Sequence, residues 1–195
     1  MKKNALIILL LFFSAQTAMS LTLDERRQRI ISIIDEELSE IERLSSQVNG
    51  RNPDHLLRMA ELNLEKARLW REKENQEYMA LPDATRRKTN KSRFFSKSAS
   101  YFAKANKLSV VITRKFPSYR DISDVYYILG FNSKEAGHHK SAAVYFSKAN
   151  KKSKSSSITK VKSQISLAEI YYNKKRYRKA IPMYENALKS YKDKW

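Results

Sequence analysis

The 195-residue sequence contains no cysteine, only three glycines and only four prolines. Without cysteine the chain forms no disulfide bond, no thiolate metal site and no cysteine nucleophile, and it cannot carry a lipid on an N-terminal cysteine. Glycine and proline interrupt helices and mark turns, so their scarcity predicts long helices rather than a sheet with many tight turns. The hydrophobic content of 42% is sufficient for a packed core at this length.

Signatures of catalysis are also missing. The sequence has no G-x-S-x-G, no phosphate-binding glycine loop and no H-E-x-x-H. The histidine pair His138-His139 has Glu135 as its one possible neighbouring ligand, and adjacent residues point in different directions on a helix, so we expect no metal site. We therefore expect no cofactor, and a protein that binds other molecules rather than an enzyme.

The N-terminus has the pattern of a secretory signal peptide. Lys2 and Lys3 precede an unbroken apolar run over residues 5–13, and small residues follow at Ala18 and Ser20. This pattern predicts export and cleavage after Ser20. The run is shorter than the roughly 20 residues that a membrane-spanning helix needs, and an uncleaved anchor is the alternative. In either case we expect the body of the chain in the bacterial periplasm, and not as a lipoprotein.

Charge is distributed unevenly along the chain. The formal net charge is +19. Residues 21–80 contain 10 Lys/Arg and 13 Asp/Glu, a net charge of −3, whereas residues 81–195 contain 27 and 7, a net charge of +20. A basic half of this size predicts an anionic partner or surface.

An amphipathic helix is expected over residues 23–48, within an N-terminal segment of residues 21–50. Its apolar residues recur at spacings of three and four. They are Ile30, Ile31, Ile34, Leu38, Ile41, Leu44 and Val48. Two interpretations stay open: a short coiled coil that associates with another chain, and a helix that packs on its own domain.

Further helices follow a break after Gly50. Asn52 is expected to be an N-cap and Pro53 to lie in the first turn of a helix over residues 54–78. The basic stretch 81–93 contains Pro82 and predicts an exposed, mobile loop. The remaining helices are expected over residues 94–115, 122–136, 139–150, 161–173 and 177–192, with a turn at Gly137 and a Ser/Lys-rich link over residues 151–160.

An internal repeat follows from two similar segments, because residues 145–150 (YFSKAN) nearly copy residues 101–106 (YFAKAN). At these positions the chain resembles the tetratricopeptide-repeat (TPR) family, whose unit is a helix–turn–helix of 34 residues. Two units match its signature at an offset of 38 residues; Ser133 departs from the pattern. The matching positions are Tyr126, Leu129, Gly130, Ala142, Phe146 and Ala149, then Leu167, Ala168, Tyr171, Ala180, Tyr184 and Ala187. In this pattern the small residues let helices approach, and the large ones fill the space between units.

The resemblance implies an all-α fold: a TPR-type solenoid of helical hairpins with about three units, the first degenerate, preceded by the amphipathic helix. The expected organisation is a signal peptide (1–20), the N-terminal helix (21–50), a degenerate first repeat (51–120) and two TPR units (121–152 and 153–195). No capping helix follows the last unit. We expect its end to be covered by a partner, a second copy or Trp195, unless the chain belongs to a longer array.

A narrower resemblance concerns residues 115–119 (KFPSY) and 124–130 (DVYYILG). They are similar to repeats of bacterial envelope TPR proteins such as the outer-membrane assembly lipoprotein BamD and the division coordinator CpoB. This resemblance implies a non-catalytic periplasmic scaffold that mediates protein–protein interactions in a cell-envelope complex for assembly, motility or division. Self-association through residues 23–48 or the C-terminal end is a further expectation.

The family resemblance also implies a binding face, because the first helix of each TPR unit lines the concave surface. Carried over by register, this face consists of Asp124, Tyr127, Phe131, Lys134, Ile165, Glu169 and Tyr172. Its aromatic and charged residues suit an extended peptide or a partner helix.

The alternative function is electrostatic binding to peptidoglycan or to an anionic lipid surface. The residues that would carry it are Arg86, Arg87, Lys88, Lys174, Lys175, Arg176, Arg178 and Lys179. Aromatic residues interleaved with basic ones would fit nucleic acid in a cytoplasmic protein, but the predicted export argues against that partner. High net charge by itself informs on solubility and identifies no site.

Overall fold

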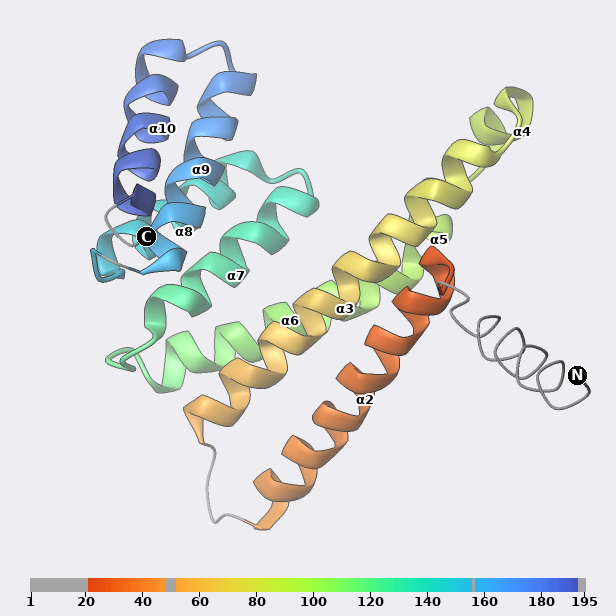
Figure 1. Cartoon of the computed structure of the whole chain (residues 1–195), viewed down its shortest axis with the longest axis horizontal. Helices are drawn as coiled ribbons and strands as arrows, with labels where there is room; N and C mark the ends of the chain where they lie inside the picture. The colour runs from red at the N-terminus through yellow and green to blue at the C-terminus, as the bar shows by residue number, and fades with distance from the viewer. Residues whose placement is uncertain (1–20, 48–51, 156, 193–195) are drawn as a thin grey trace, which may run out of the picture.

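The computed structural model describes residues 21–47, 52–155 and 157–192, and in this part the chain is all-helical, with nine helices and no strand (Figure 1). In chain order the helices are α2 (Leu23–Gln47), α3 (Pro53–Ala80), α4 (Asp83–Lys88), α5 (Lys91–Phe94), α6 (Ser96–Lys115), α7 (Ile122–Glu135), α8 (His139–Lys152), α9 (Ile158–Asn173) and α10 (Tyr177–Lys192). None of these helices combines the length and apolar character needed to cross a membrane. The predicted signal peptide, Val48, Gly50 and Trp195 lie outside the described residues.

Helix α3 begins where the sequence predicts. The Asn52 side chain accepts a hydrogen bond from the backbone N–H of Asp54 at 2.8 Å, and Pro53 occupies the first helical position. Both features satisfy or remove donors that have no partner inside the helix, which fixes the start of α3. The predictions of an N-cap at Asn52 and of Pro53 in the first turn are confirmed.

Helix α6 runs antiparallel to α3, and together they form the first hairpin (Figure 1). Their contact contains the fully buried alanines Ala60, Ala67 and Ala105, which bring the two backbones close together. Buried Glu74 of α3 accepts the backbone N–H groups of Lys97 and Ser98 at 3.1 Å each. A side chain from α3 therefore caps the start of α6.

Helix α2 packs on its own domain, which was one of the two interpretations of its apolar stripe. Ile31 and Ile34 are buried within the single chain. Four charged links also join α2 to α3. Arg58 donates to both Glu37 oxygens at 2.5 and 2.8 Å, and Lys66 pairs with Asp35. The other two pairs are Arg27–Glu72 and Lys73–Asp24. The edges of the stripe remain exposed.

The segment predicted as a mobile loop over residues 81–93 is folded, so that prediction was wrong. It contains α4 and α5, and Asn90 caps α5 by accepting the N–H of Arg93 at 3.1 Å. Behind these helices the rings of Tyr78, Phe94 and Phe95 meet, with centroids 5.4–5.6 Å apart. This aromatic cluster buries enough apolar surface to order a basic segment.

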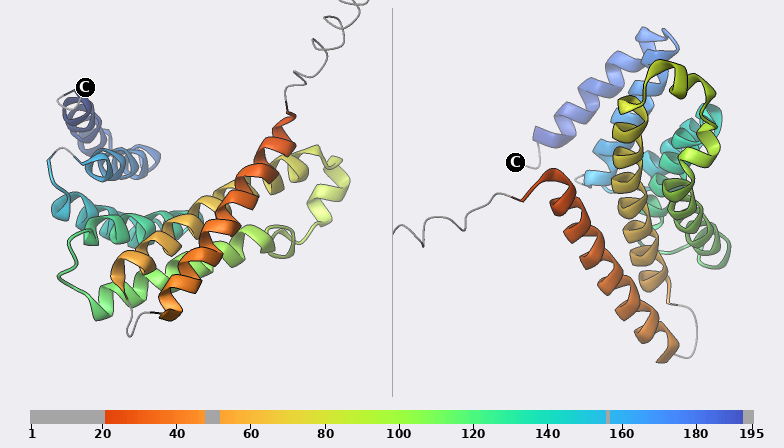
Figure 2. Two further views of the ribbon diagram at one scale, coloured as in Figure 1. Left: turned by 60° about the horizontal axis from the view of Figure 1, so that its bottom comes forward. Right: turned by 90° about the vertical axis from the view of Figure 1, so that its right-hand side faces the viewer.

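Two further hairpins, α7–α8 and α9–α10, complete the described chain. Gly137 turns the first with φ +77°, as predicted, and Lys175 turns the second with φ +57°. These two turn residues lie 38 residues apart, the offset between the repeat units in the sequence. In the ribbon, α2, α3 and α6 form one arm that ends at α4, and α7 to α10 form a second arm (Figures 1 and 2).

Candidate functional site

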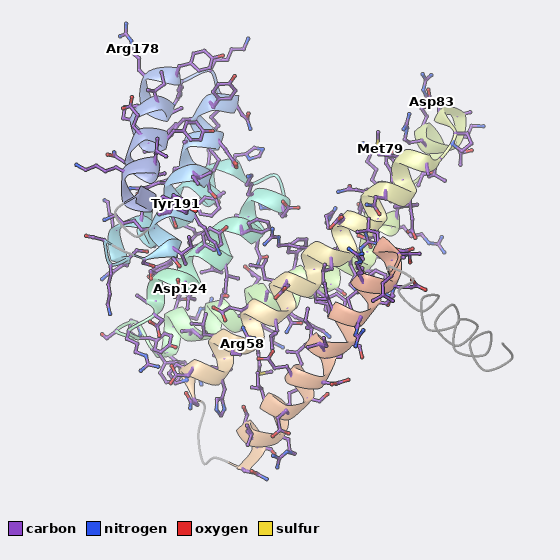
Figure 3. The ribbon with its side chains drawn as sticks, viewed as in Figure 1. Arg58, Met79, Asp83, Asp124, Arg178 and Tyr191 are labelled. Atoms are coloured by element: carbon purple, nitrogen blue, oxygen red, sulfur yellow. The ribbon has the colours of Figure 1, made fainter. Side chains whose placement is uncertain are left out.

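A groove of about 590 Å³ lies where the two arms meet, and α3, α7 and α9 form its walls. Its apolar surface comes from the half-buried ring of Tyr127 and from exposed Ile158, and Leu64 and Ile128 are buried beneath. Arg58 and Asp124 stand on the α3 and α7 sides (Figure 3). The remaining charged lining residues are Glu61, Glu65, Arg68 and Lys162.

Helices α7 and α9 are neighbours held by two polar links. The Thr159 hydroxyl donates to Asp124, and Lys134 forms an ion pair with Glu169. Both links join residues 35 positions apart, so the two helices run in the same direction at constant register. The α7 face from Asp124 to Lys134 is therefore aligned with α9 over about three turns.

Two carboxyl groups of the groove have raised pKa values. Burial raises the pKa of Glu61, partly opposed by the Arg58 guanidinium, and the charge of Asp124 raises it further. Burial also raises the pKa of Asp124, opposed by the hydrogen bond from Thr159. The charge of Lys162 lowers the pKa of both groups and so opposes the effect of burial. This end of the groove therefore already holds two cations, Arg58 and Lys162, beside its carboxyl groups.

Two other charges in the groove, both on α3, have no ion pair. Among the described residues, Glu65 and Arg68 form none, whereas Arg58 pairs with Glu37 and Glu61. The Arg68 guanidinium lies 5.4 Å from the ring centroid of Phe131, a cation–π contact between α3 and α7. Charges of both signs are therefore available to a ligand.

The groove continues along α3 into a second hollow of about 490 Å³ between α3, α6 and α7. The two hollows share Glu65 and Arg68, and the second adds the rings of Phe102 and Phe131, 6.4 Å apart. Together they form a channel along α3 long enough for several residues of an extended peptide.

The structure brings part of the predicted concave face to this channel. Asp124 and Tyr127 line the groove, and Phe131 lines the second hollow. Lys134 and Glu169 pair with each other farther along α7 and α9, while Ile165 and Tyr172 are exposed on α9. These last four residues do not line the two hollows.

Sequence reasoning missed the wall that α3 contributes. Its residues Arg58, Glu61, Glu65 and Arg68 follow spacings of three, four and three. The predicted α7 face from Asp124 to Lys134 follows the same spacings, so this pattern was the available signal. It was hidden because the α3 sequence departs from the repeat pattern, so its register could not be aligned with the segments that match it.

The predicted packing residues mostly lie in the interior. Buried in α7 to α10 are Leu129, Gly130, Ala142, Phe146, Ala149, Leu167, Ala168, Ala180 and Ala187. Tyr126 and Tyr171 are half-buried against the two core clusters. Tyr184 is 38% exposed, because no described helix packs on that face of α10.

The predicted basic residues lie at the ends of the two arms. Arg86, Arg87 and Lys88 belong to α4, and the other five surround the turn between α9 and α10. All eight are exposed except Arg86, which is half-buried and pairs with Asp83.

Comparison with known proteins identifies no family: no protein-family model matches the sequence, and no curated protein matches it.

Proposed function

We propose that the protein is a non-catalytic helical scaffold whose channel along α3, α7 and α9 binds a partner protein as an extended peptide or a helix. The groove of about 590 Å³ carries this proposal, because it combines the apolar surface of Tyr127 and Ile158 with charges of both signs. Apolar contacts give a bound peptide affinity, and placed charges fix its register.

We also propose that α7–α8 and α9–α10 are TPR-type units. Three observations support this assignment, and each recurs at the same offset of 38 residues. Left-handed turn residues occur at 137 and 175, and small buried residues occur at 130 and 168 and again at 142 and 180. On this assignment α3 and α6 are the degenerate first unit, with α4 and α5 inserted in its turn. The predicted signal peptide and the envelope resemblance support the proposal that this scaffold works in a periplasmic complex.

A site-specific photocrosslinker tests the channel in intact bacteria. Placed at Lys162 in the groove it should trap a defined partner, whereas at exposed Val144 on α8 it should not. The variant Arg68→Glu/Lys162→Glu should weaken partner binding by at least about ten-fold, because each change reverses a charge facing the ligand. The matched variant Arg114→Glu/Lys151→Glu reverses two exposed charges elsewhere and should bind normally. Equal loss in both variants would contradict the proposal.

The Lys134–Glu169 pair allows a second test. Lys134→Glu alone sets two carboxylates against each other, so it disturbs both the α7–α9 link and any ligand contact. The exchanged variant Lys134→Glu/Glu169→Lys restores an ion pair but reverses the charges that a ligand meets. Recovery of binding in the exchanged variant would show that the pair only supports the packing. Continued loss would extend the ligand contact to this end of α7.

A further inference from the structure

Two strongly basic segments of the described chain lie on the same side of the molecule. We define the α4 tip as residues 79–93 and the α10 tip as residues 172–179. Both stand at the upper end of the molecule in Figure 1, and both remain there in the view of Figure 2 turned about the vertical axis. Figure 3 marks them by Met79 and Asp83 on one arm and by Arg178 on the other. A flat surface can therefore touch both tips at once.

Each tip carries five Lys or Arg residues that are largely available. At the α4 tip, Arg86 pairs with Asp83, while Arg87, Lys88, Lys91 and Arg93 have no ion pair among the described residues. At the α10 tip the five cations are all exposed, and none is ion-paired within the described chain. They are Lys174, Lys175, Arg176, Arg178 and Lys179.

Exposed apolar and aromatic side chains accompany these cations. Met79 is 67% exposed beside α4, and Tyr172 and Tyr177 are 56% and 47% exposed beside the α10 turn. Tyrosine among lysine and arginine is typical of segments that sit in a lipid headgroup layer. The tips thus offer attraction to anions together with groups that insert shallowly.

From these observations we infer that the α4 tip and the α10 tip form a two-point contact for a membrane surface rich in anionic lipid. A small anion would engage one tip only, whereas a lipid surface spans both. Nucleic acid is the less suitable polyanion, because the Tyr172 and Tyr177 rings pair edge-to-face with centroids 5.3 Å apart and do not offer parallel faces for bases. The inference is independent of the channel, which lies between the arms.

Both tips belong to elements that are held by packing. Binding of one tip to a surface therefore also brings the other tip to that surface. The aromatic cluster of Tyr78, Phe94 and Phe95 holds the α4 tip, and the α9–α10 hairpin holds the other. Once one tip is bound, the second meets the lipid at high effective concentration. Each Lys or Arg close to an anionic leaflet strengthens binding by about five-fold, so three neutralised cations at one tip should weaken it by about 100-fold.

The test is vesicle flotation with the full chain, using phosphatidylcholine alone and phosphatidylcholine with roughly one-third phosphatidylserine. Binding to neutral vesicles measures any contribution of the apolar residues 5–13. The readout is therefore the ratio of the affinity for anionic vesicles to the affinity for neutral vesicles. The α4-tip variant is Arg87→Gln/Lys88→Gln/Arg93→Gln, and the α10-tip variant is Lys174→Gln/Arg178→Gln/Lys179→Gln. The control Arg114→Gln/Lys115→Gln/Lys151→Gln removes the same charge from exposed positions away from both tips.

Either tip variant should lower the anionic-to-neutral ratio by about 100-fold, the combined variant should bring the ratio close to one, and the control should lower it only a few-fold. A Tyr177→Trp probe should shift its fluorescence to shorter wavelength on anionic vesicles. An equal loss in the control would overturn the proposal, because net charge alone would then explain binding. Tip-dependent binding to duplex DNA without binding to vesicles would also overturn it, as would vesicle binding without a fluorescence shift.

Discussion

Adding a side chain at the Gly137 turn should destabilise the protein, whereas removing the side chain at the Lys175 turn should stabilise it. Gly137 has φ +77°, and a Cβ atom added there would meet no atom within 4 Å. Gly137→Ala therefore changes only the backbone energy. The left-handed conformation costs an L-residue about 1–2 kcal/mol, and the smaller entropy of unfolded alanine returns about 0.4–1 kcal/mol. We expect the free energy of unfolding to fall by about 1 kcal/mol.

Lys175 is the complementary case, because it holds φ +57° with a side chain. Lys175→Gly removes this strain and should raise the free energy of unfolding by about 0.5–1 kcal/mol. Lys175→Ala removes the same charge but keeps the strain, so the difference between these two variants isolates the turn. The loss of the lysine charge affects the stability of both variants equally.

The assay is urea unfolding followed by helical circular dichroism, with the transition midpoint compared at an unchanged slope. Stacked hairpins can unfold in parts, so the midpoint of the transition that involves the substituted hairpin is the quantity to compare. The reasoning fails if Gly137→Ala is as stable as the parent chain. It also fails if Lys175→Gly is no more stable than Lys175→Ala.

Two other substitutions test packing. A Cβ at Gly130 would lie 2.7 and 2.8 Å from ring atoms of buried Phe146, so Gly130→Ala should destabilise by about 1–3 kcal/mol despite the better helix propensity of alanine. When Phe146→Leu is added to Gly130→Ala, thermal melts should show that part of the lost stability returns. Glu74→Ala leaves a buried and a part-buried N–H group of α6 without an acceptor and should cost about 2–3 kcal/mol, whereas Glu77→Ala, at an exposed position of the same helix, should cost less than about 0.5 kcal/mol in urea unfolding.

The sequence predicts the helices well because their ends depend on local chemistry. Asn52 and Pro53 define the start of α3, and Gly137 defines the turn between α7 and α8, through interactions within a few residues. The α4 tip was misjudged for the opposite reason. Its order comes from Phe94 and Phe95 meeting Tyr78, and this contact depends on how α3 and α6 approach each other.

The candidate channel was only partly predictable. Spacing alone identifies Asp124, Tyr127 and Phe131 as one helix face, and the structure places them along the channel. Spacing does not show that Lys134 is already paired with Glu169, because that link depends on the relative shift of α7 and α9. The α3 wall was missed because the α3 sequence departs from the repeat pattern and gives no register to copy.

The two ends of the molecule differ in charge. The carboxylates of α2 gather in its second half, between Asp35 and Glu42, and this end of α2 lies opposite the two basic tips in Figure 1. Near an anionic surface such a charge distribution exerts a torque that turns the tips toward the surface and the acidic end of α2 away from it. The channel runs between these ends, with its polar walls open to solvent. A molecule held at its tips therefore presents the channel to a partner without first releasing the surface.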